Sequence, residues 1–379
     1  MYRYLLWLLL FGSPHILPAQ TEEAADNKVK VEIGGALRFN YNYSSWKPNQ
    51  RKRGGDLGFE VFRLTVDASR KKWSFKLDQR FYAAGFGGAF LKFGWFQYAL
   101  KEDANFKFGL LPAYFGAQQF NSHSWFFQLP FYLGFEDDHD MGISYSVDKV
   151  DYQLDIGFYK NAETLTFADN APISDARYAY DFSGRNKEIN QLNVRYNHKL
   201  GAAKDQKLGG TLQVGGIWNI DTESVGLQRA VGLHYETTFE RWNVQAQFID
   251  YDNRPQNAPG ENRDAIEMTA YGFPYQTAAR ARLYSAGVAY TLPVKWGPVT
   301  ALQFYDDYSY MDKAVVTWED TQMNVLGILV SAHPVFIYVD WAAGLHQPWL
   351  GPQWADALTT GERSNGWESR FNVNFGYYF

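Results

Sequence analysis

Apolar and polar residues alternate along this chain from about residue 29 to the last residue, and no helical period interrupts the alternation for long. In residues 72–80, Trp73, Phe75 and Leu77 fall on one face, and charged residues fall on the other. Successive side chains of a strand point to opposite faces, so this period predicts strands with one apolar and one charged face. Such strands form either a sandwich with its apolar face inward or a barrel with its apolar face in lipid.

The connections between the expected strands alternate in length. We expect about sixteen strands, near residues 29–43, 57–68, 72–82, 90–100, 104–112, 140–148, 150–160, 187–200, 207–220, 228–239, 241–252, 279–292, 298–310, 320–332, 335–346 and 367–379. Turns after the even-numbered strands are short, whereas most connections after odd-numbered strands are longer. Outer-membrane barrels have tight periplasmic turns and long extracellular loops, whereas a sandwich has no reason to sort its loops by parity. The sequence therefore predicts an all-β transmembrane antiparallel β-barrel of about sixteen strands.

The last residues support the same fold. Every second residue is apolar up to an aromatic C-terminus, in the series Phe371, Val373, Phe375, Tyr377 and Phe379. This ending is typical of the terminal strand that the outer-membrane assembly machinery recognises in barrel proteins. A bilayer permits only backbones whose hydrogen bonds are all internal, and strands meet that condition by closing into a barrel. The 26 Tyr and 13 Trp then suit the interfacial girdles of such a barrel.

The first residues predict export. Arg3 supplies a positive charge, residues 5–11 form a short apolar segment, and Pro14 breaks it before Ala19. We therefore expect a signal peptide at residues 1–19 and an outer-membrane barrel at residues 20–379, in a Gram-negative bacterium. The alternative, an N-terminal membrane anchor, needs about twice this apolar length. The chain has no Cys, which excludes disulfides, thiolate metal ligands and a Cys nucleophile.

One long connection, residues 113–140, is too apolar for the cell exterior. Barrels of eight strands fill with side chains, whereas sixteen or more strands enclose a water-filled passage. We expect residues 113–140 to fold into that passage as a constriction loop. The aromatic side chains expected to pack against the barrel wall are Trp125, Phe126, Phe127, Phe131 and Tyr132. The alternative is that these side chains rest on neighbouring loops or on another subunit.

Charge is distributed unevenly along the chain. Residues 31–110 carry 14 Lys and Arg against 7 Asp and Glu, whereas residues 111–379 carry 19 against 31. Cationic groups on a pore wall favour anions such as phosphate or carboxylate. The basic side chains on polar strand faces, which we expect to line the pore, are Arg38, Arg63, Lys76, Arg80 and Lys107. The alternative is that they pair across strands with Glu32, Asp67 and Asp78. Because acidic strand faces occur elsewhere in the barrel, the sequence leaves open whether the pore prefers anions.

Part of the chain resembles a known family. The segments that carry the resemblance are FKFGLLPAYFG at residues 106–116, SHSWFF at 122–127 and GFEDDHDMG at 134–142. They are similar to the phosphate-selective porin O and P family and its looser relatives, most clearly over residues 57–160 and in the C-terminal strand. The resemblance implies a sixteen-stranded, often trimeric porin with a basic lumen. The family's anion-binding arginine ladder cannot be placed on residues of this chain, so phosphate specificity is not implied.

Three short patterns invite a catalytic or metal-binding interpretation. Adjacent Ser122 and His123 lack the fixed geometry and the third group of a hydrolase, so we expect no enzyme. Residues 136–140 lack the Gly and the spacing of an EF-hand loop, so we expect a solvated acidic strand start and no metal site. His234 has no second His placed to join it, so we expect it on the pore wall. We recognise no cofactor motif and no nucleic-acid motif.

The sequence thus predicts an outer-membrane porin for passive diffusion of small hydrophilic solutes, with a preference for phosphate-like anions as the finer hypothesis. Its expected partners are outer-membrane lipid, small hydrophilic or anionic solutes and further copies of the chain in a homotrimer, but no nucleic acid. The alternative is a non-conducting barrel that serves as a structural or accessory subunit of an envelope complex.

Overall fold

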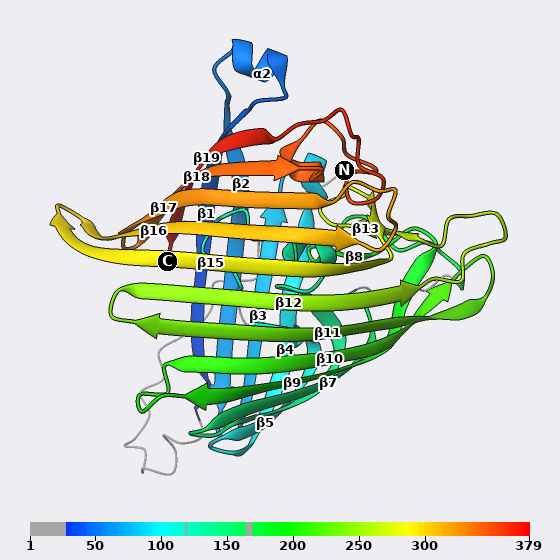
Figure 1. Cartoon of the computed structure of the whole chain (residues 1–379). Coiled ribbons are helices and arrows are strands. Elements are labelled where there is room, and N and C mark those ends of the chain that lie inside the picture. Colours follow the sequence, from blue (N-terminus) through cyan, green and yellow to red (C-terminus); the bar gives the residue numbers. More distant parts are fainter. Residues whose placement is uncertain (1–27, 118–119, 164–168) are drawn as a thin grey trace, which may run out of the picture.

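The computed structural model describes residues 28–117, 120–163 and 169–379, so the expected signal peptide lies outside the described residues. In these residues, sixteen antiparallel strands close into one barrel (Figure 1). The barrel strands are β1 (Lys30–Ser44), β2 (Asp56–Arg70), β3 (Trp73–Tyr82), β4 (Ala89–Lys101), β5 (Ala104–Pro112), β6 (His139–Asp148), β7 (Tyr152–Asn161), β9 (Asn186–Leu200), β10 (Gln206–Asn219), β11 (Ser224–Phe239), β12 (Trp242–Arg254), β15 (Arg280–Trp296), β16 (Val299–Lys313), β17 (Thr321–Ala332), β18 (Val335–Leu345) and β19 (Glu368–Tyr378). The predicted fold class is confirmed.

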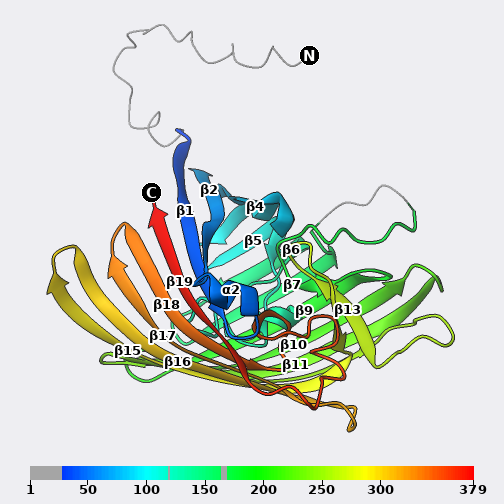
Figure 2. The ribbon, with the colours of Figure 1, turned by 90° about the horizontal axis from the view of Figure 1, so that it is seen from above.

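The barrel closes between its first and last strands. β1 pairs with β19 from Ala36 opposite Tyr378 to Ser44 opposite Arg370. The Gly35 N–H donates to the Phe379 carbonyl at 2.9 Å, and the Phe379 N–H donates back at 3.1 Å. Figure 2 shows the two strands side by side, with the C-terminus at the end of β19. Closure removes the free strand edges that a bilayer does not tolerate.

The outer face of the barrel is apolar and the inner face is mostly polar. On β11, Val231 and Leu233 are exposed on the outside, whereas His234 is buried on the inside. Exposed apolar side chains of this kind recur around the barrel wall, from Phe39 on β1 to Phe375 on β19. A sandwich would bury this face, so the alternative fold is excluded. An apolar belt around a closed barrel is suited to lipid, and the protein is an integral barrel of the outer membrane.

The two ends of the barrel differ in the length of their connections. The turns after β2, β4, β6, β9, β11, β15 and β17 are short and lie at one end, which we call the short-turn end. The opposite, long-loop end carries the connections between β5 and β6, β7 and β9, β12 and β15, and β18 and β19. The sequence predicted this parity and the sixteen strands. The predicted and the observed strand bounds differ most at the start of β11, predicted at residue 228 and observed at 224, and at the end of β15, predicted at residue 292 and observed at 296.

The long connections contain short elements that the sequence did not predict. In the described part of the chain, β8 (Asp181–Phe182), β13 (Ala265–Thr269) and β14 (Tyr275–Ala278) form a separate sheet in the order β14-β13-β8. Helix α2 (Pro48–Lys52) projects beyond the barrel wall in Figure 1. Three 3-10 helices also lie in the connections, namely η1 (Ala84–Phe86), η2 (Phe131–Leu133) and η3 (Pro348–Leu350). Among the described residues, no helix is long and apolar enough to cross a membrane.

The largest apolar core lies inside the barrel. The inward side chains of Ile249 on β12, Leu283 on β15 and Met311 on β16 are fully buried. They belong to one cluster with Leu129 and Phe131 from the connection between β5 and β6. This connection therefore packs against the inner wall, and part of the interior is filled with side chains rather than open.

Candidate functional site

The connection between β5 and β6, residues 113–138, crosses the barrel interior, and we call it the inner loop. Its Gly116 N–H donates to Thr211 Oγ1 of β10 at 3.1 Å. Its Ala117 N–H donates to Gln247 Oε1 of β12 at 2.9 Å. Further along, its Leu129 N–H donates to Ser309 Oγ of β16 at 3.1 Å. These bonds join the loop to the wall opposite β5 through inward-facing polar side chains.

A glycine allows the inner loop to approach that wall. Gly116 has a φ of 59°, a left-handed conformation that favours glycine. A Cβ atom at this position would lie 2.1 Å from Gln247 Oε1. Both the backbone conformation and the close approach therefore require Gly at the point where the loop leaves β5.

The aromatic residues named from the sequence lie together in the inner loop. Phe126, Phe131 and Tyr132 are buried, while Trp125 and Phe127 are partly buried against the same interior core. Phe127 stacks on Phe131, with 4.0 Å between the ring centroids. The Tyr132 hydroxyl donates to the Phe126 carbonyl at 2.7 Å. The aromatic side chains thus hold the loop in one shape as well as against the wall.

A buried carboxylate anchors the tip of the inner loop. Oδ2 of Asp307 on β16 accepts hydrogen bonds from the backbone N–H groups of His123 and Ser124, both at 2.8 Å. Oδ1 of Asp307 lies 2.8 Å from His123 Nδ1, and Nε2 of this ring lies 2.6 Å from Asn243 Oδ1. Burial disfavours the imidazolium, but the hydrogen bond and charge of Asp307 outweigh burial and raise the pKa of His123.

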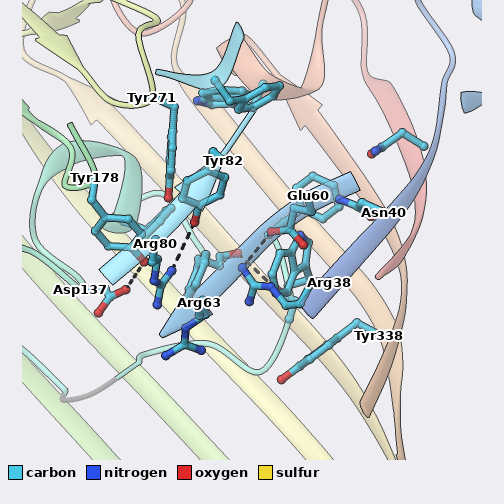
Figure 3. Close-up of a pocket in the computed structure, with 18 of the residues that line it drawn as sticks. Arg38, Asn40, Glu60, Arg63, Arg80, Tyr82, Asp137, Tyr178, Tyr271 and Tyr338 are labelled. Atoms are coloured by element: carbon cyan, nitrogen blue, oxygen red, sulfur yellow. Dashed lines mark hydrogen bonds and ion pairs between the residues drawn. The ribbon is translucent and has the colours of Figure 1, made fainter. Parts of the chain in front are cut away.

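Three of the five predicted pore-lining basic residues surround one cavity (Figure 3). Arg63 and Arg80 both pair with Asp78, at 2.7 and 3.2 Å. Arg38 pairs with Glu60 at 2.8 Å, and its guanidinium lies 4.2 Å from the ring centroid of Trp125. The alternative, pairing across strands, therefore occurs between Arg63 of β2 and Asp78 of β3, and the same carboxylate also pairs with Arg80 of its own strand.

Two β-bulges aim further charged residues into this cavity. In the β1–β2 ladder, Arg38 faces Val61 and Phe39 faces Phe59, so Glu60 is left without a partner in register. In the β3–β4 ladder, Asp78 and Gln79 face residues 93 and 91, so Lys92 is likewise the extra residue. A bulge bends the strand and redirects its side chains. Sequence reasoning missed Glu60 and Lys92 as site residues because a strict two-residue period does not register a bulge.

The cavity has a volume of about 520 Å³ and lies between β1–β4 and the inner loop. Lys92 Nζ donates to Asp137 at 2.7 Å, and the Tyr178 hydroxyl donates to the same carboxylate oxygen at 2.6 Å. The guanidinium of Arg80 lies 4.5 Å from the ring centroid of Tyr178. Arg370 also lines the cavity and donates to Ser44 Oγ at 3.2 Å. Cationic and aromatic side chains therefore form much of its wall.

The other two predicted basic residues lie elsewhere. Lys107 lines a second cavity of about 290 Å³ and donates to the Tyr114 hydroxyl at 3.0 Å. His234, inward as predicted, lines the same cavity. Lys76 lies nearer the short-turn end, where its side chain is 48 % exposed and pairs with Asp67 at 3.3 Å. Asp137 lines both cavities, so the two spaces adjoin at the base of the inner loop.

Ser122 and His123 do not face one another. The Ser122 hydroxyl donates to Glu136 Oε1 at 3.1 Å, whereas Asp307 and Asn243 engage the two ring nitrogens of His123. The pair therefore lacks the serine–imidazole hydrogen bond on which a hydrolase depends.

The acidic run at residues 136–140 is buried, so the expectation of a solvated strand start was wrong. The inner loop carries these residues into the barrel, where the connections of the long-loop end cover them. Burial raises the pKa of Glu136 to about 8, although hydrogen bonds from Asn121 and Ser122 oppose this shift. The charges of residues 136–140 indicated exposure to solvent, whereas the path of the inner loop through the barrel buries these residues.

The fold is similar to that of solved outer-membrane channels. The outer-membrane channel DcaP of Acinetobacter baumannii has a TM-score of 0.60 at 12% identity, covering 96% of this chain and 100% of that one. An anion-selective porin from Comamonas acidovorans has a TM-score of 0.59 at 12% identity over 93% and 100%. The trimer form of OmpT, an outer-membrane protein of Vibrio cholerae, has a TM-score of 0.58 at 14% identity over 93% and 100%.

Sequence comparison does not assign the chain to a family. No family model matches the chain, and no curated protein matches it. Membership of the phosphate-selective porin O and P family therefore stays a prediction, while the barrel fold of outer-membrane porins is established.

Proposed function

We propose that this protein is an outer-membrane channel through which small hydrophilic solutes diffuse passively, with a preference for anions. The observation that carries the proposal is the cationic lining of the larger cavity. Arg63 and Arg80 share Asp78, and Arg370 donates to the Ser44 hydroxyl and pairs with no carboxylate among the described residues. The positive charge on this wall exceeds the negative charge that neutralises it, which lowers the free energy of an anion there.

Reversal potentials in planar bilayers under a salt gradient test the anion preference. Arg63 is the sharpest target, because its side chain is 21% exposed and can reach solute while Arg80 keeps Asp78 paired. Arg63→Gln should shift the reversal potential toward cations. Lys72→Gln, at the exposed β2–β3 turn, removes the same charge outside the cavity and should leave the potential unchanged. A cation-selective wild type, or equal shifts in the two variants, would refute the proposal.

We also propose that the inner loop narrows the channel. Its hydrogen bonds to β10, β12 and β16 and its aromatic side chains in the interior core support this proposal. Deletion of residues 121–132 should therefore increase single-channel conductance. An unchanged current would reject the constriction. A circular dichroism spectrum of the deletion protein verifies that the barrel is folded before its current is compared.

The apolar core inside the barrel favours one second candidate function, a non-conducting barrel in an envelope complex. Leu129 and Phe131 pack there with wall residues rather than leaving an aqueous passage around them. The two functions predict different bilayer recordings. Stepwise wild-type currents support the channel. A wild type that gives no current in any condition would support the accessory barrel, provided that the variant without residues 121–132 does conduct.

We propose no enzymatic role for Ser122, whose hydroxyl donates to Glu136 rather than to an imidazole. Assays of lipid hydrolysis with wild type and Ser122→Ala test this directly. An activity that the substitution abolishes would overturn the assignment.

We propose that copies of the chain assemble as a homotrimer through the outer face of β16 and β17. Asp306 points outward near the middle of β16, and Asn324 of β17 donates to it at 2.6 Å. A carboxylate on the lipid face is unfavourable at membrane depth, so cover by a second copy stabilises it. Chemical cross-linking in mild detergent should give trimers, and Asp306→Trp should abolish them. Monomers in the wild type would contradict this assembly.

A further inference from the structure

Three aspartates come together where the inner loop ends. Asp138 closes the inner loop, Asp140 lies on β6, and Asp181 begins β8. One carboxylate oxygen of each residue lies within 4.8 Å of those of the other two. The three residues are 7%, 1% and 1% exposed. Segments about forty residues apart in the sequence thus bring three carboxylates into one buried space.

Asp140 has no hydrogen-bond partner for either carboxylate oxygen within the described part of the chain. The neighbouring carboxylates are partly satisfied, since Asp138 accepts from the His139 N–H at 2.8 Å and Asp181 from the Phe182 N–H at 2.7 Å. A buried carboxylate without any donor is costly, because burial removes its water and nothing replaces it. Among the described residues, Asp140 therefore makes no hydrogen bond of its own, and the positive charge of Arg177 acts on it only through space.

The charge around Asp140 is also uncompensated. Arg177 pairs with Asp181 and with Glu163, so its single positive charge already serves two carboxylates. Glu188 on β9 lies close enough to interact with Asp181. Among the described residues this cluster thus combines five carboxylates with one guanidinium. Like charges at this separation repel strongly in a buried site, and a bound cation relieves that repulsion.

Space and access adjoin one of the three aspartates, Asp138. A cavity of about 10 Å³, close to the size of one water molecule, lies beside Asp138 and Glu188. Gln228 also lines it, and its Oε1 atom has no partner among the described residues. Asp138 lines the 290 Å³ cavity as well, which offers a path to solvent.

We propose that Asp138, Asp140 and Asp181 bind a divalent cation, Ca²⁺ in preference to Mg²⁺. The donors are oxygen atoms, which hard cations favour. The site is nearly dry and irregular, and Ca²⁺ accepts such a set of protein oxygens, whereas Mg²⁺ retains several waters in a strict octahedron. The bound ion joins the base of the inner loop to β8 and, through it, to β13, which pairs with β8. It therefore fixes the loop from the long-loop end, as Asp307 fixes its tip.

Calcium titration of the purified full-length chain tests the site independently of any current. After treatment with EDTA, the wild type should bind one buried Ca²⁺ by calorimetry, and about 1 mM CaCl₂ should raise its unfolding temperature. MgCl₂ should raise it less. Asp140→Asn keeps the shape of the side chain and should weaken Ca²⁺ binding by at least about tenfold. Asp169 is an exposed residue of the connection between β7 and β9, which also contains Asp181. The Asp169→Asn variant should bind Ca²⁺ as tightly as the wild type does.

Two results would overturn the proposal. One is a wild type whose unfolding temperature and titration heat do not respond to Ca²⁺, which would mean that protons rather than a metal neutralise the cluster. The other is an Asp140→Asn variant that binds Ca²⁺ as tightly as the wild type, which would place the ion on exposed carboxylates. If Asp140→Asn does not fold, the wild-type titration and Asp138→Asn decide the question.

Discussion

Asp307→Ala should release the tip of the inner loop from the barrel wall. Asp307 is fully buried and accepts from two backbone N–H groups and one imidazole nitrogen of the loop. The substitution leaves these groups without an acceptor. An unsatisfied buried donor costs about 1–3 kcal/mol, so the loss of an acceptor for three groups costs the docked loop roughly 3 to 9 kcal/mol. Since 1.4 kcal/mol is about tenfold, the ratio of docked to undocked tip falls by more than about a hundredfold.

The rest of the loop should stay in place. Phe131 and Tyr132 are buried in the interior core, and each buried aromatic side chain contributes about 1.5–3 kcal/mol. The side-chain hydrogen bonds of Asp307 to the loop go to His123 and Ser124 rather than to these aromatic residues. The release should therefore affect residues 120–126 and leave the segment around η2 docked. Asp307→Asn keeps one carbonyl acceptor for the two N–H groups, so its effect should lie between wild type and Asp307→Ala.

Single-channel recording and limited proteolysis measure this release. We expect larger or noisier current steps in Asp307→Ala and faster cleavage within residues 120–126 of the detergent-solubilised protein. Asp312→Ala removes a half-exposed carboxylate from the outer face of the same strand and should change neither property. If Asp307→Ala has wild-type conductance and wild-type resistance to protease, Asp307 does not hold the loop and the reasoning fails.

Two further predictions concern titration and a buried ion pair. Because the folded-state pKa of His123 is raised, its stabilising contribution is complete below about pH 6.5 and is lost as pH rises through the folded-state value. The difference in unfolding temperature between wild type and His123→Gln should therefore shrink as the pH rises above about 6.5, and a constant difference would contradict this. The groups that face the imidazole are Asp307, Asn243, Glu236 and Tyr305. Arg38→Met should destabilise the folded barrel by about 3–5 kcal/mol in denaturant titrations, because it leaves the Glu60 carboxylate buried without its ion pair. Arg38→Lys should lose less, and a loss below about 1 kcal/mol for Arg38→Met would show that the pair is dispensable.

The small elements and the bulges escaped sequence reasoning for physical reasons. β8 has two residues and β14 has four, too few to show a period. Glu60 and Lys92 occupy bulges, where one extra residue shifts the alternation that the prediction relied on. Of the five basic residues inferred from alternation, Arg38, Arg63 and Arg80 do meet at one cavity, because their strands are neighbours in the barrel. Lys76 and Lys107 follow the same alternation, but neither of them lines this cavity.

The sequence by itself determined the closed barrel, its strand number, the parity of its loops and the apolar outer face. Each of these follows from a two-residue period and from the turns that interrupt it, which are local properties of the chain. The sequence also indicated that residues 113–140 enter the interior, but only the tertiary structure decided which groups hold the loop there and what surrounds it. The anchor of His123 on Asp307, the burial of the acidic run and the meeting of Asp140 with Asp181 join segments far apart in the sequence. Such contacts depend on the path of the inner loop through the barrel, which alternation along single strands does not encode.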